Sequence, residues 1–187
     1  MKKFTIALAA LASTTLASPA LAVTPSGDST GTVTINGSVA DRCLFTTPSK
    51  TINLGELSQG GTTDDAGKLD SSVVDNQSET LVGWCNGTSA TMTVEAEPIV
   101  NTDFTGTPPD GFTRVVNYTA SAEANEETAT DSSTDDGAGT AADVGIFTGN
   151  VVVTLSNSSA GSDLLVAGAY AGQVLVTLSP SVTPPSP

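Results

Sequence analysis

The two cysteines of the chain, Cys43 and Cys85, are the residues best suited to form a covalent cross-link. They lie 42 positions apart, so they do not form the C-x-x-C spacing of a redox-active pair. In an exported protein, two cysteines usually form one structural disulfide. The sequence therefore predicts a Cys43–Cys85 disulfide, and closing a loop of this length stabilises a fold by roughly 4 kcal/mol in the chain-entropy model.

Catalytic chemistry has few candidate residues because histidine is absent from the chain. This excludes a Ser-His-Asp arrangement and a histidine-ligated zinc site. A pair of carboxylates, as in glycosidases, is the remaining option. Glu95 and Glu97 share one face of an expected strand, but an exposed polar row is the simpler interpretation. We therefore expect neither enzyme activity nor a cofactor.

Residues 123–144 are the candidate for a metal site, because they carry seven acidic side chains and almost no large apolar one. Carboxylates suit calcium. However, counting from Asp131 places Asp136 where an EF-hand loop needs glycine and Ala142 where it needs the bidentate glutamate. The segment is predicted to be a mobile, solvated loop, with a short helix at 123–129 as the alternative, and no metal site is expected.

The first 22 residues have the organisation of a secretory signal peptide. Lys2 and Lys3 precede an apolar stretch at residues 4–16, and Ala20-Leu21-Ala22 forms a small-x-small cleavage site. Without the two lysines, 20 acidic and four basic residues remain, a net charge of −16. A surface this acidic is a poor partner for nucleic acid or anionic lipid. No later segment is long enough to span a bilayer.

The rest of the chain is predicted to be β-structure, because short alternating runs rich in Val, Thr and Ile are separated by turn-forming residues. The runs are TVTINGSV (32–39), KTINLGEL (50–57), ETLVGWC (79–85), TMTVEAE (91–97), FTRVVNYTASA (112–122), GNVVVTLS (149–156) and AYAGQVLVTLS (169–179). About seven strands in one domain indicate a sandwich of two antiparallel sheets.

The alternation also assigns side chains to faces of the strands. The predicted inward rows are Met92, Val94 and Ala96; Phe112, Val116, Tyr118 and Ala120; and Tyr170, Gly172, Val174, Val176 and Leu178. Trp84 is expected to pack in the core against the disulfide. The chain is thus divided into a signal peptide (1–22), an N-terminal extension (23–31), a β-sandwich (32–179) and a Pro/Ser-rich segment (180–187).

Three linked features suggest a family. They are an alternating run that ends in a cysteine, GTVTINGSVADRC (31–43), an I-x-L-G run, TINLGEL (51–57), and a second cysteine that ends the next run, ETLVGWCNG (79–87). Together with the closing AGAYAGQVLVTLS (167–179), they resemble the pilins of bacterial chaperone–usher fimbriae. The spore-coat-U-type secreted subunits belong to the same broad group.

The resemblance implies an immunoglobulin-like sandwich that lacks one strand and so leaves an apolar groove. A periplasmic chaperone first lends a strand, an outer-membrane usher receives the subunit, and the extension of the next subunit then fills the groove. Mapped onto this chain, the extension is the segment from Val23 to about Thr34, and Val23, Val33 and Ile35 are its candidate anchors. The candidate groove residues are Val174, Val176 and Leu178.

The sequence therefore predicts one of two functions. The first is a structural subunit of an extracellular fimbria or fimbria-like coat, exported through the inner membrane, in transit in the periplasm, and joined to neighbouring copies by donor-strand exchange. The alternative is a secreted or surface-attached binding module that never polymerises. It would hold a sugar or protein ligand with loops near Trp84, Phe104 and Phe112.

Overall fold

The computed structural model describes residues 27–62 and 64–180. The predicted signal peptide (1–22), the anchor candidate Val23 and residues 181–187 lie outside the described residues. The chain divides into two units at the boundary between residues 38 and 39.

Residues 27–39, called the arm from here on, contain no strand, and every side chain in them is exposed. Val33 is 86% exposed, Ile35 91% and Val39 84%. The prediction of a strand at 32–39 is therefore wrong for the single chain. A strand is defined by hydrogen bonds to a neighbouring strand. The alternation of the arm is present in the sequence, but no strand of the described chain pairs with it.

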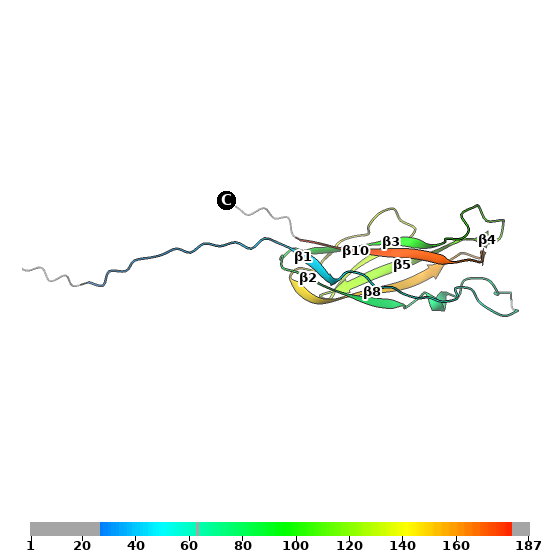
Figure 1. The fold of residues 1–187 in the computed structure, drawn as a ribbon, viewed down its shortest axis with the longest axis horizontal. Coiled ribbons are helices and arrows are strands. Elements are labelled where there is room, and N and C mark those ends of the chain that lie inside the picture. Colours follow the sequence, from blue (N-terminus) through cyan, green and yellow to red (C-terminus); the bar gives the residue numbers. More distant parts are fainter. Residues whose placement is uncertain (1–26, 63, 181–187) are drawn as a thin grey trace, which may run out of the picture. The chain divides into compact units, whose positions relative to one another are not determined.

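The regular elements of the second unit are strands, apart from one short 3-10 helix (Figure 1). The elements are β1 (Cys43–Thr47), the short 3-10 helix η1 (Ser71–Val73), β2 (Ser78–Cys85), β3 (Thr91–Asn101), β4 (Phe112–Thr113), β5 (Val115–Ala124), β6 (Glu127–Ser132), β7 (Ala142–Asp143), β8 (Phe147–Ser159), β9 (Leu164–Leu165) and β10 (Tyr170–Ser179).

The strands follow the order β1-β2-β8-β5-β3-β10, with β6 beside β5 and β7 beside β3. All pairs in this sheet are antiparallel. The β3–β5 pair is only two residue pairs long, Ile99–Val116 and Val100–Val115, after which β5 continues along β8. At this corner the sheet bends around the core and is nearly closed. The predicted all-β, sandwich-like class is confirmed.

The core consists mainly of small and medium-sized apolar side chains. The predicted inward row of β3 is confirmed, since Met92 and Val94 are fully buried and Ala96 is nearly so. Val116, Tyr118 and Ala120 of β5 are buried too. Phe112 does not belong to that row: it lies in the separate strand β4 and is 42% exposed.

The predicted Cys43–Cys85 disulfide is confirmed, and it joins residues that are directly opposite each other on β1 and β2. Cys85 is buried. Trp84 takes the other face of β2 because successive side chains of a strand point to opposite sides. There it is half-buried, opposite Leu44 and Thr148 on the neighbouring strands. The prediction that Trp84 packs against the disulfide in the core is therefore wrong.

Residues 123–144 do not form the predicted mobile loop or a helix. Asn125 and Glu126, with φ angles of 51° and 68°, make a two-residue turn, and β6 then returns along β5 in an antiparallel hairpin. The inward row of β6 and the residue after it is Ala129, Asp131 and Ser133, all buried. Sequence reasoning missed this strand because its buried side chains are small or polar and give no hydrophobic alternation.

The buried Asp131 supplies a hydrogen-bond acceptor to the backbone of β3. Its Oδ2 accepts from the amide of Ala96 at 2.8 Å. Replacing Asp131 by Ala leaves that amide without its acceptor, so we expect Asp131→Ala to lower the free energy of unfolding by roughly 1–3 kcal/mol. Urea unfolding measures this change.

The matched variants separate the hydrogen bond from the negative charge. Asp131→Asn keeps a side-chain oxygen at the same place and should cost less than Asp131→Ala. Asp136→Ala, at an exposed position, should have almost no effect. Equal midpoints for Asp131→Ala and the unsubstituted protein would rule out this role of the carboxylate.

Candidate functional site

One border of the candidate site is the extended segment 48–57, which follows β1. Residues 50–57 were predicted to form a strand, and this is wrong, because no residue from 48 to 57 has a β-bridge. Alternation is visible in the burial of residues 51–54, where Ile52 and Leu54 are half-buried against the core and their neighbours are exposed. Leu57 is buried too, but it falls outside this alternation. Residues 51–54 therefore have the side-chain pattern of a strand but no strand partner in the described chain.

The opposite border is β10, the last strand of the sheet order. Its pairing with β3 runs from Tyr170–Asn101 to Ser179–Thr91, and its other edge has no partner strand within residues 27–62 and 64–180. The predicted groove residues Val174, Val176 and Leu178 are only half-buried. The row opposite them on β3 is buried. The inward side chains of β10 are less buried than those of β3 because β10 has a neighbouring strand on one edge only.

Between these two borders lies a groove of about 1230 Å³. Its residues beyond the two borders are mostly apolar side chains of the core strands and of the segment that precedes β10. They include Phe45, Leu81, Ile99, Tyr118, Val153, Leu155 and Leu165. The groove is therefore long, apolar inside, and bordered on both sides by extended backbone.

The groove narrows where β1 approaches the end of β10. A Cβ atom added to Gly83 would lie 3.1 Å from a side-chain carbon of Phe45 and 3.1 Å from one of Leu178. Phe45 and Leu178 thus meet over the glycine of β2. At the far end the segment reaches Leu57, close to β9 and the start of β10. Residues 43–57 therefore run antiparallel to β10.

Tyr118 connects the inside of the groove to the β3–β10 pair. Its hydroxyl lies 2.8 Å from the carbonyl oxygen of Glu97 and 2.9 Å from that of Gln173. The two carbonyl oxygens belong to β3 and β10, next to the point where the register of this strand pair shifts between Ala171 and Gln173. Burial, followed by the nearby carboxylates of Glu97 and Asp131, raises the pKa of Tyr118 to about 12.

This raised pKa predicts a loss of stability at high pH. A tyrosine in the unfolded chain loses its proton near pH 10, whereas Tyr118 in the fold keeps it to about pH 12. The contribution of this pKa difference to the free energy of unfolding is therefore fully present below about pH 10 and is lost as the pH rises towards 12. Urea unfolding at about pH 9 and pH 11.5 should show the protein losing more stability than Tyr118→Phe. An equal loss in both would disprove this.

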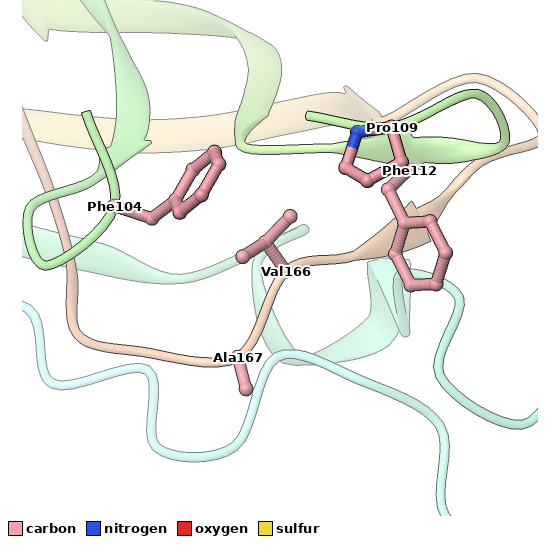
Figure 2. Close-up of a pocket in the computed structure, with 5 residues that line it drawn as sticks. All are labelled: Phe104, Pro109, Phe112, Val166 and Ala167. Carbon is pink, nitrogen blue, oxygen red and sulfur yellow. The ribbon is translucent and has the colours of Figure 1, made fainter. Parts of the chain in front are cut away.

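A second, smaller cavity lies among the loops next to β4 and β9. It measures about 220 Å³ and is lined by Phe104, Pro109, Phe112, Val166 and Ala167. Figure 2 shows Val166 between the side chains of Phe104 and Phe112. Two of the three aromatic residues proposed from the sequence as ligand contacts are therefore brought together. Trp84 is not, since it lies on β2 beside Cys85.

The walls of this cavity are held by one buried side chain that sequence reasoning missed. Asn101 is 1% exposed, and its Nδ2 donates to the carbonyl oxygens of Val166 at 2.9 Å and Ala167 at 3.2 Å. Its Oδ1 accepts from the amides of Asp103 at 3.0 Å and Phe104 at 2.8 Å. Nothing in the local sequence signals the link to the second wall, because the two carbonyl partners of Nδ2 lie 65 and 66 residues away.

Residues 27–62 and 64–180 contain no group of three or more His, Cys, Asp or Glu placed to hold a metal ion. Nor does a helix in those ranges have the length and apolar character needed to cross a membrane. The groove offers extended backbone along its borders and apolar side chains inside, and the cavity offers apolar contact. Comparisons with protein-family models, with curated proteins and with solved structures found no match to this chain.

Proposed function

We propose that this protein is a structural subunit of an extracellular fimbria or fimbria-like surface coat, assembled by donor-strand exchange. The observation that carries the proposal is an apolar groove open along one edge of β10 in a chain whose own arm has no strand partner. The resemblance to chaperone–usher pilins, drawn from the cysteine spacing and the flanking runs, supports the same function.

The chemistry of the groove favours an extended strand as its occupant. The free edge of β10 and the segment 48–57 both present backbone donors and acceptors. A strand between them would hydrogen-bond to both and place every second side chain over the apolar interior. It would also cover an edge that is otherwise prone to aggregation.

The arm has the length and the side-chain pattern of such a strand. Residues 31–39 are nine in number, against ten for the border 48–57. Val33, Ile35 and Val39 fall on one face of an extended chain and are almost fully exposed. Burying each of them contributes roughly 1.5–3 kcal/mol. We therefore assign the donor role to residues 31–39, with Val33 and Ile35 among the predicted anchors.

Insertion of one copy's arm into the next copy's groove builds a fibre. The contact joins two different surfaces of the same protein, so each added copy leaves a new groove or arm free, and the assembly extends. An arm antiparallel to β10 continues the antiparallel pairing of the sheet to which β10 belongs, and it then runs parallel to the border 48–57. Before assembly, a periplasmic chaperone and an outer-membrane usher would protect the groove, as the resemblance implies.

The alternative, a non-polymerising secreted binding module, is favoured by one specific observation, the cavity between Phe104 and Phe112. At about 220 Å³ it lies below the roughly 300–1,000 Å³ of pockets for drug-sized ligands. It therefore suits apolar side chains of a protein partner better than a sugar. A stable monomer in size-exclusion chromatography, with no copurifying chaperone, would favour this function.

The direct test compares the exported protein with a variant that lacks residues 23–35. On a non-denaturing gel the complete protein should form a ladder, and the deletion variant should not. A synthetic peptide of residues 27–42 should bind the deletion variant, whose groove is intact. Assembly that proceeds equally well without residues 23–35 would reject the donor role.

A further inference from the structure

The cavity lined by Phe104, Pro109, Phe112, Val166 and Ala167 lies at the end of the domain where β10 begins, and all of its lining residues are apolar. Its walls are fixed in advance by the buried Asn101. A preformed apolar cavity of about 220 Å³ offers space for one or two uncharged side chains and no partner for a charged group. Its occupant is therefore expected to be an apolar peptide segment.

One segment of the chain has this chemistry. Residues 180–187, PSVTPPSP, contain four prolines and one valine and no charged side chain, although the whole chain has a net charge of −14. Proline has no amide hydrogen to give to a sheet. Proline-rich segments instead bind aromatic-lined clefts in an extended left-handed conformation. A cleft between two phenylalanines beside Pro109 is a surface of this kind.

The segment cannot reach the cavity of its own domain. From Tyr170 to Ser179, β10 makes nine steps of about 3.3 Å, roughly 30 Å in all, and the cavity lies beyond Tyr170. Pro184 and Pro185 follow Ser179 by five and six residues, a reach of at most about 20 Å. Only the segment of another copy can bring these prolines to the cavity.

Donor-strand assembly brings the C-terminal end of β10 of the donor copy next to the cavity of the acceptor copy. Cys43 and Ser179 lie at the same end of the domain, because Cys43 pairs with Cys85 and Ser179 with Thr91 across the short β2–β3 connection. Strand β4 lies at the opposite end (Figure 1), and its Phe112 lines the cavity. An arm bound antiparallel to the acceptor's β10 leaves the groove at this cavity end, so the donor's domain, with its Ser179, begins there.

We propose that the cavity binds residues 180–187 of the neighbouring copy and so forms a second joint beside each inserted strand. This inference rests on the proposed donor-strand assembly and deepens it. Because the inserted strand holds the two copies together, the segment is at a high effective concentration next to the cavity. A weak contact is then enough to slow the separation of the joint.

The binding step is tested with a fluorescein-labelled peptide of residues 179–187 titrated into the monomeric deletion variant lacking residues 23–35, in which no neighbouring copy fills the cavity, with anisotropy as the readout. Saturable binding is expected. Phe112→Ser should weaken it at least about tenfold by removing one aromatic wall. Ile146→Ser, at an exposed apolar residue outside the cavity, is the matched control and should bind as before. A peptide with Pro184, Pro185 and Pro187 replaced by Ala should bind more weakly.

Absence of saturable binding, or equal binding by Phe112→Ser, would overturn the proposal. The assembly step is then tested with a chain that stops after Ser179. It should still form a ladder, but its joints should separate faster in urea than those of the complete chain. Equal rates would overturn the second joint and leave donor-strand exchange standing. If the complete chain forms no ladder, donor-strand exchange itself is overturned. The second joint, which depends on donor-strand exchange, is then overturned as well.

Discussion

The double substitution Val33→Asp, Ile35→Asp is expected to stop a copy from donating its arm while leaving its groove able to accept one. Each buried anchor contributes roughly 1.5–3 kcal/mol, so removing both costs about 3–6 kcal/mol. This corresponds to a weakening of the contact by about 10²- to 10⁴-fold. The carboxylates add to the loss because an unpaired charge is costly to bury. The isolated domain should be unaffected, since both residues are almost fully exposed.

A mixing experiment checks this result without depending on the fimbria. The arm variant is combined with Val176→Asp, which keeps its arm but places a charge in the groove. On a non-denaturing gel each variant alone should remain monomeric, and the mixture should give dimers and no longer species. Circular dichroism verifies that both variants fold.

The matched control for the arm changes the opposite row of side chains. Thr32→Asp, Thr34→Asp carries the same added charge on residues that face away from the groove in the proposed complex. This variant should assemble into long ladders. Ladders from Val33→Asp, Ile35→Asp of the same length as those of the unsubstituted protein would exclude these residues as anchors.

Loss of the Cys43–Cys85 disulfide is expected to lower the free energy of unfolding by about 4 kcal/mol. The reason is the entropy of the unfolded chain, in which the cross-link closes a loop with a sequence separation of 42. A loss of this size is a large part of the roughly 5–15 kcal/mol that stabilises a typical domain. The disulfide also holds the five-residue edge strand β1, from which the groove border 48–57 continues.

Urea unfolding of the monomeric deletion variant lacking residues 23–35 measures the effect, with and without a reducing agent. Comparing the oxidised and reduced forms of one sequence avoids the separate cost of placing a serine hydroxyl at the buried position of Cys85. The double variant Cys43→Ser, Cys85→Ser should then be no more stable than the reduced protein. A difference below about 1 kcal/mol between the oxidised and reduced forms would contradict the expected stabilisation.

Local pattern was sufficient for four of the strands that are paired within the chain. The runs 79–85, 91–97, 149–156 and 169–179 correspond to β2, β3, β8 and β10. Their inward rows follow from alternation alone, because a strand exposes every second side chain to the same face. The disulfide was equally predictable, since the chain has only two cysteines.

The strand β6 and the cavity could not be predicted from local pattern. Ala129 and Asp131 are buried because β5 and β3 lie against them, and neither residue type indicates burial in the sequence. Asn101 joins the two walls of the cavity across 65 residues, a connection that no local window contains. In both cases the burial arises from contacts between distant segments.

The sequence by itself determined that the protein is a disulfide-linked, all-β domain, and which side chains of each run share a face. Only the tertiary structure decided which runs are strands. The runs 32–39 and 50–57 alternate as regularly as β3 does, yet neither is paired within the described chain. Alternation is a property of one extended segment, whereas strand pairing needs a second segment with free backbone groups at the right distance.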